Sequence, residues 1–128
     1  MGEEEGEVGE EFNLMAIPAL EKQAAEIKLK SYLEEKCPPE LWDQVKLVYE
    51  AKGQSITVFE KRPHWQEPTE ITMSPVTKFS YNNKDRIWSI LWCDRNSKFH
   101  NFDPPIRSKK FDDLLKVLDR DETCIFWG

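Results

Sequence analysis

The sequence predicts an α+β fold in which a mainly antiparallel sheet of about five strands, arranged as a meander, is flanked by an N-terminal and a C-terminal helix. Three observations predict it. Residues 86–94 alternate as a strand does between two polar turns, residues 111–118 carry apolar side chains at helical spacing, and residues 19–36 contain neither Gly nor Pro. Because each helix has a single apolar side, we expect both to cover the same face of the sheet.

The length and charge of the chain indicate one folded domain with an acidic extension. At 128 residues the chain can bury one core, and we place a single domain at residues 15–128 after a disordered acidic tail at residues 1–14. The first twelve residues hold six Glu and no Lys or Arg, and the remainder balances 18 acidic against 18 basic residues. This balance argues against strong sequence-independent binding of nucleic acid, but it does not exclude a local basic patch.

The cysteines and the hydropathy pattern indicate a cytoplasmic protein. Cys37, Cys93 and Cys124 lack the paired short spacing of a zinc or redox motif, so we expect three free thiols in a reducing compartment. No apolar run approaches the length of a membrane span. We therefore expect no membrane association, and no motif indicates a cofactor.

The first helix is predicted over residues 19–36 and ends at Cys37 because two prolines follow. A short helical turn is expected over residues 40–44, with Trp42 as an anchor into the core. The helix should pack through an apolar stripe that begins at one end and continues obliquely along the helix. Its members are Leu20, Ala24 and Ile27, continued by Leu29, Tyr32 and Leu33.

Two strands, residues 45–50 and 55–62, form the clearest hairpin, with Gly53 supplying the unusual backbone angle of the turn. Residues 63–75 contain three prolines and indicate a long connection, after which residues 77–81 alternate as a third strand.

Residues 86–94 form the predicted fourth strand, and a fifth follows the Asp-Arg-Asn-Ser turn. Alternation puts Trp88, Ile90, Trp92 and Asp94 on one face and Ile87, Ser89, Leu91, Cys93 and Arg95 on the other. Neither set is polar, so the face that the helices leave uncovered is a candidate binding surface or dimer contact.

The C-terminal helix has Ser108 as its expected N-cap and ends near Arg120. Its apolar residues recur at i, i+3, i+4 and i+7. The chain then ends on Cys-Ile-Phe-Trp-Gly, in which we expect Phe126 and Trp127 to pack on the sheet or on the first helix.

Three motifs in order resemble those of a small bacterial family known as domain of unknown function number three thousand and twenty-four. They are Arg-Pro-x-Trp-x-x-Pro from Arg62, Trp-x-Asp-Arg-Asn-x-Lys-x-His from Trp92, and Asp-x-Thr-x-Ile-Phe-Trp-Gly from Asp121. The resemblance covers residues 16–128 and supports one domain there. It implies no reaction, cofactor or site.

A cluster of polar and aromatic residues near strand ends is the candidate site. One interpretation is that Asp94 and Asn96 only stabilise a turn while Arg95 and Lys98 cover neighbouring rings. The other is a recognition surface, in which cations contact phosphate or carboxylate and a Trp stacks on a ring. The candidate binding residues are Arg62, His64, Trp65, Trp92, Asp94, Arg95, Lys98 and His100.

The enzyme alternative is a metal-dependent hydrolase or nuclease-like activity that uses Glu60, Asp94 and a histidine, His64 or His100. The sequence has no H-E-x-x-H, P-loop, G-x-S-x-G or G-x-G-x-x-G motif. Cys93 as a nucleophile is disfavoured because it alternates within a strand, where thiols are usually buried. We therefore expect a non-catalytic interaction module whose partner, a protein, a nucleic acid or a second copy of the chain, is not identified by the sequence.

Overall fold

The computed structural model describes residues 16–67, 69–122 and 125–127. The predicted tail at residues 1–14 and Cys124 lie outside them. The predicted fold class is confirmed, since two helices flank a mainly antiparallel sheet. The elements are α2 (Ala19–Lys36), η1 (Pro39–Leu41), β1 (Lys46–Lys52), β2 (Ser55–Pro63), β3 (Ile71–Asn82), β4 (Ile87–Cys93), β5 (Phe99–Asn101), β6 (Arg107–Ser108) and α3 (Phe111–Arg120).

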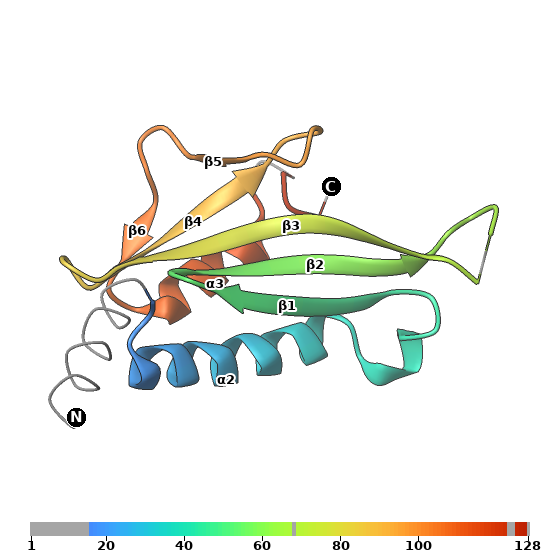
Figure 1. Ribbon diagram of the computed structural model, residues 1–128, viewed down its shortest axis with the longest axis horizontal. Coiled ribbons are helices and arrows are strands. Elements are labelled where there is room, and N and C mark those ends of the chain that lie inside the picture. The colour runs from blue at the N-terminus through green and yellow to red at the C-terminus, as the bar shows by residue number, and fades with distance from the viewer. Residues whose placement is uncertain (1–15, 68, 123–124, 128) are drawn as a thin grey trace, which may run out of the picture.

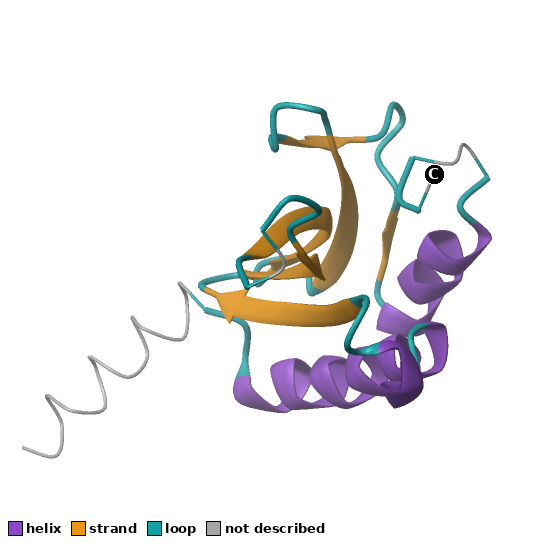
Figure 2. Cartoon of the chain, turned by 90° about the vertical axis from the view of Figure 1, so that its right-hand side faces the viewer, coloured by secondary structure: helices purple, strands orange, loops and turns teal. Residues whose placement is uncertain are grey.

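The sheet is a meander in the order β1-β2-β3-β4-β5, with β6 pairing the edge of β4 beyond β5. Every ladder between these strands is antiparallel. Both helices lie on one side of the sheet, so its other side, turned to the viewer in Figure 1, has no helix over it. Figure 2 shows the same arrangement from the side. We call this uncovered side the open face.

Alternate strand residues form the core beneath the helices. Ile56, Val58, Phe79, Trp88 and Ile90 are each at most 1% exposed. They meet an apolar surface from the helices, and burying each large side chain contributes about 1.5–3 kcal/mol to folding. The helix residues of this cluster are Ala25, Leu29, Leu33, Phe111, Leu114 and Leu118.

The prediction of a long connection over residues 63–75 is wrong in its second half. β3 begins at Ile71 and pairs with β2 as far as Pro63. The register shifts where Pro75 faces Phe59, so Val76 has no partner and forms a bulge. Proline lacks the N–H that a regular ladder requires, and a bulge accommodates it.

The paired segments beyond this bulge, residues 59–63 and 71–75, form what we call the arm. Thr77 pairs with Trp92, and β4 ends one residue later at Cys93, so the arm extends past the end of β4. Figure 1 shows it projecting from the body of the sheet on the right.

The predicted facing of the first helix is also wrong in part. Leu20 and Ile27 are 82% and 64% exposed, whereas Ala25, Leu29 and Leu33 are buried. The buried residues are four apart, which keeps them nearly in line along the helix. Trp42 does not reach the core either, because it is 38% exposed and its Nε1 donates to the Cys37 carbonyl at 3.0 Å.

Ser108 is not the N-cap of the last helix. It lies in β6, and Lys110 is the N-cap residue. The Ser108 hydroxyl accepts from the Lys110 N–H at 3.0 Å and donates to the Asp113 carboxylate at 2.6 Å. Ser108 therefore stabilises the start of α3 from a position two residues before the N-cap residue.

The end of the chain packs against the core, as predicted. The Asp121 carboxylate accepts from the N–H groups of Phe126 and Trp127 at 3.0 and 2.8 Å. The Trp127 indole donates to the Leu118 carbonyl at 3.0 Å, and Lys36 of α2 lies over its ring. Within the described ranges, neither helix is long and apolar enough to cross a bilayer.

Candidate functional site

The structure divides the predicted binding residues into two groups. Trp92, Asp94, Arg95, Lys98 and His100 surround the turn between β4 and β5. The other three residues lie on the arm or in the loop at its tip. In Figure 1 the turn is at the top of the molecule and the tip of the arm is at the far right. The residues of the second group are Arg62, His64 and Trp65.

Asp94 organises the β4–β5 turn. Its Oδ1 accepts from the N–H groups of Asn96 and Lys98 at 2.8 and 3.0 Å, and its Oδ2 lies 2.7 Å from His100 Nε2. The hydrogen bond from His100, followed by that from the Lys98 N–H, lowers the pKa of Asp94 from 3.8 to about 2. Asp94 therefore stabilises the turn as the first interpretation requires, while Arg95 and Lys98 remain exposed on it.

An aromatic pair lies beside this carboxylate. Trp92 and His100 face each other across β4 and β5, and their ring centroids are 4.8 Å apart. Trp88 and Trp92 belong to the same face of β4, as predicted, but only Trp88 is fully buried. His100 is thus held between a carboxylate and an indole.

On the arm, side chains of the predicted site are engaged with one another. Arg62 forms an ion pair with Glu60. His64 Nδ1 accepts from the N–H groups of Gln66 and Glu67 at 3.1 and 3.2 Å, which fixes the ring against the loop at the tip of the arm. The ring of Trp65 is 82% exposed and stacks loosely on His64, with centroids 6.1 Å apart.

The groups named for the hydrolase alternative are divided in the same way. Asp94 contacts His100, but Glu60 is paired with Arg62 on β2. The described residues include no group of three or more His, Cys, Asp or Glu side chains placed to hold a metal ion. Burial raises the pKa of the Cys93 thiol, and the neighbouring Asp94 carboxylate adds to the effect. Fewer thiolates form as a result, which disfavours Cys93 as a nucleophile.

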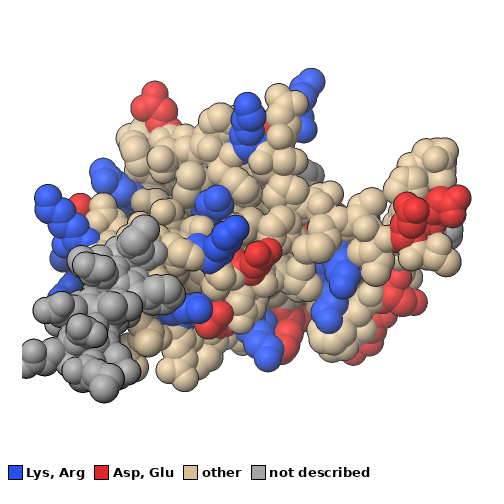
Figure 3. All heavy atoms as spheres, in the orientation of Figure 1, with Lys and Arg blue, Asp and Glu red and all other residues tan. Residues whose placement is uncertain are grey.

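Sequence reasoning missed a set of cations on the open face. The register places five basic strand residues there, and Glu50 is the one acidic residue among the described strand positions of this face. Figure 3 shows Lys and Arg side chains spread over the middle of this face. The hairpin prediction could have revealed part of the set, because counting back from the Gly53 turn puts two lysines opposite each other. The five cations are Lys46, Lys52, Lys61, Lys78 and Arg107.

Two phenylalanines lie among these cations. Phe59 faces Val48 on β1, and Phe99 faces Cys93 on β4. Both rings are half-buried. Lys78 Nζ is 4.7 Å from the centroid of Phe99, so a cation and a ring are in contact near the middle of the sheet.

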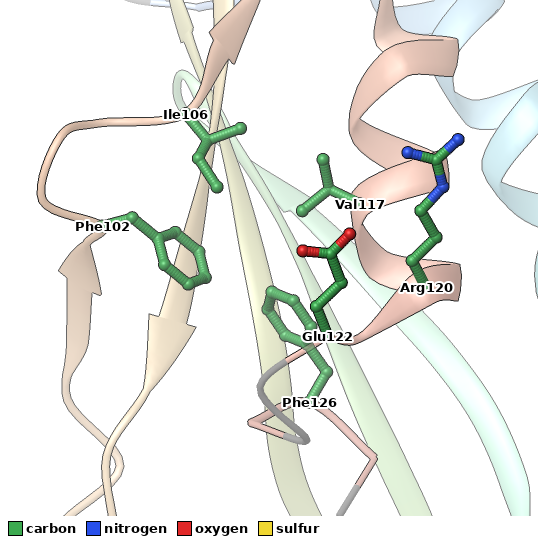
Figure 4. A pocket seen from close by; sticks show the side chains of 6 residues that line it. All are labelled: Phe102, Ile106, Val117, Arg120, Glu122 and Phe126. Atoms are coloured by element: carbon green, nitrogen blue, oxygen red, sulfur yellow. The ribbon is translucent and has the colours of Figure 1, made fainter.

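A pocket of about 200 Å³ lies on the side of the sheet that the helices cover, between the β5–β6 connection and α3. Figure 4 shows Phe102 and Ile106 facing Val117, with Phe126 below them and the Glu122 carboxylate turned inward. Its walls are mostly apolar, and its two charged lining residues, Arg120 and Glu122, have opposite charges. The pocket therefore offers no net positive charge to an anion.

A protein-family model described as Domain of unknown function (DUF3024) matches residues 17–128, which confirms the resemblance seen in the motifs. No curated protein and no solved structure matches the chain.

Proposed function

The chain belongs to the family DUF3024, whose description assigns no activity, and we propose from the geometry that it is a non-catalytic module that binds single-stranded nucleic acid on its open face. The observation that carries the proposal is the imbalance of five cations to one carboxylate among the described strand positions of that face. The chain from residue 13 onward has no net charge. The basic character of the open face therefore comes from the placement of basic residues there and not from an excess of basic over acidic residues in the chain. A polyanion is the partner that such a surface attracts.

The rings favour a single strand over other polyanions. Base stacking needs aromatic groups interleaved with cations. Phe59 lies two residues from Lys61 on β2, and Phe99 of β5 contacts Lys78 of β3 across the face of β4. Arg95 and Lys98 extend the basic surface at the β4–β5 turn, where Asp94 holds the backbone. In this arrangement the cations contact phosphates and the rings contact bases.

A cytoplasmic setting fits the proposal, because Cys37 and Cys93 are both free thiols.

The test is binding of a labelled short single-stranded oligonucleotide, followed by fluorescence anisotropy over a range of salt concentrations. For single strands, log K falls with log salt by about 0.7 for each phosphate neutralised, so five cations set a slope of about −3.5. Lys78→Gln should reduce that slope by about 0.7. Phe99→Leu keeps an apolar side chain but removes the ring, and should weaken binding about tenfold.

Lys116→Gln is the matched control, because Lys116 is an exposed lysine of α3 on the covered side. Its binding curve should overlay that of the unchanged protein. Equal losses in the Lys78 and Lys116 variants, or binding that does not change with salt, would contradict the proposal. Capture of an acidic protein without any affinity for oligonucleotides would assign the face to protein recognition instead.

A further inference from the structure

A second pocket, of about 250 Å³, lies where β2 continues past the start of β1. The β1–β2 ladder begins at Lys46 opposite Lys61, so the last residues of β2 have no partner on that side. The segment after η1 and the start of β3 close the space. We call it the Trp42 pocket, and its lining includes Trp42, Asp43, Lys46, Lys61, Arg62 and Ile71.

The charges of the Trp42 pocket favour an anion. Lys46 and Lys61 are directly opposite each other across the strands, and like charges in that position destabilise a sheet. Arg62 adds a guanidinium whose Nε is bound to Glu60 but whose terminal N–H groups are separate donors. Asp43 is the opposing carboxylate among the lining residues. A phosphate between the two lysines would remove their repulsion.

The indole of Trp42 supplies a flat surface in the same pocket. Its Nε1 is fixed by the Cys37 carbonyl at 3.0 Å, yet the side chain is 38% exposed. Lys46 Nζ lies 4.4 Å from the ring centroid, so a cation is already placed against the ring. An aromatic surface beside cations is suited to the base and the phosphate of a nucleotide.

The geometry points to the Trp42 pocket as the subsite for a terminal nucleotide of the bound strand, with its end phosphate between Lys46 and Lys61 and its base against Trp42. Lys61 belongs both to this pocket and to the open face, so a strand crossing the face ends here. At about 250 Å³ the pocket is smaller than the ~300–1,000 Å³ of drug-sized sites, which limits it to one nucleotide. The inference rests on the proposed function and adds to it a preference for phosphorylated ends.

The experiment compares short oligonucleotides of one sequence with and without a terminal phosphate, at each end in turn. We expect one phosphorylated end to bind on the order of tenfold more tightly. Lys46→Gln should abolish that difference and weaken unphosphorylated strands no more than Lys78→Gln does, because each variant removes one open-face cation. Lys78→Gln, which lies outside the Trp42 pocket, should keep the difference. Lys30→Gln is the control, because Lys30 is exposed on α2 and lies near Lys46 without lining the Trp42 pocket. Thermal melting of each variant checks that the fold is intact.

A nucleoside monophosphate is the second probe, read through quenching of tryptophan fluorescence. Saturable quenching that is lost in Trp42→Phe supports the subsite, whereas equal quenching in that variant would overturn it. If strands bind equally with and without terminal phosphates, the subsite is refuted and the open-face proposal stands. If no strand binds but the monophosphate quenches Trp42, the open-face proposal fails and the pocket alone is the binding site.

Discussion

The burial of α2 provides a sharp test of the fold, because two neighbouring apolar residues differ in exposure. Leu29 is 0% exposed, and Leu29→Ala should cost about 2–5 kcal/mol, the lost transfer free energy plus the cavity that remains. Ile27 is 64% exposed, so Ile27→Ala gives up about a third of a full burial, below about 1 kcal/mol. The better helix propensity of Ala offsets about 0.4 kcal/mol of that loss.

Urea denaturation followed by circular dichroism measures both variants. With a slope of about 2 kcal/mol per molar urea, the middle of the usual range, Leu29→Ala should move the midpoint down by about 1–2.5 M, and Ile27→Ala should leave it nearly unchanged. Equal shifts, or a larger loss for Ile27→Ala, would refute the arrangement of α2 and restore the stripe expected from the sequence.

Three further predictions concern ionisation and charge. Because the pKa of Asp94 is lowered, the carboxylate stabilises the fold above pH 3.8, its ordinary pKa, and this stabilisation is lost as the pH falls toward about 2. The NMR chemical shift of the Asp94 carboxyl carbon should change with a midpoint near pH 2, and a midpoint near pH 4 would contradict the His100 contact. Burial, with a smaller effect of Asp119, raises the pKa of Tyr32, so Tyr32 should not form a phenolate near pH 10 and the free energy of unfolding should fall as the pH rises above that value. The measurement is the difference in ultraviolet absorbance between the unchanged protein and Tyr32→Phe, and phenolate formation near pH 10 in that difference would exclude the raised pKa. Removing residues 1–12 takes away six negative charges and should strengthen oligonucleotide binding at low salt, and this gain should decrease as the salt concentration rises. Replacing the six Glu by Gln is the length-matched control. If neither form binds more tightly, the segment does not repel the strand.

The sequence predicted those elements whose side chains repeat with a clear period. Phe111, Leu114 and Leu118 repeat as a helix does, and residues 86–94 alternate as a strand does, so α3 and β4 were placed correctly. The first half of β3 was missed because Pro75 argued against a strand, and only the bulge at Val76 shows how the ladder accommodates it. The facing of α2 was missed because apolar residues lie on more than one of its sides.

The site was harder to predict because it depends on register rather than on neighbouring residues. Asp94 and His100 are close in sequence, and their contact across a short turn could be anticipated. Lys46, Lys61 and Lys78 are each at least fifteen residues apart and meet on one face only once the strands are paired. Arg62 was grouped with the β4–β5 turn by residue type. Arg62 faces Thr72 near the start of β3, whereas Trp92 near the end of β4 faces Thr77, so the first part of β3 separates them.

The bulge at Val76 also divides the molecule into parts of unequal local stability. Past it, β3 pairs with β2 alone, and beyond Lys61 β2 no longer pairs with β1, so the end of the arm is a two-stranded ribbon. Such a ribbon is marginally stable unless other elements pack on it. Ile71 and Met73 are more than half exposed there, so little apolar burial opposes separation of its strands. The ribbon therefore unfolds locally while the core remains folded. In hydrogen-exchange NMR, the amide hydrogens of residues 71–74 should exchange far faster than those of residues 77–81.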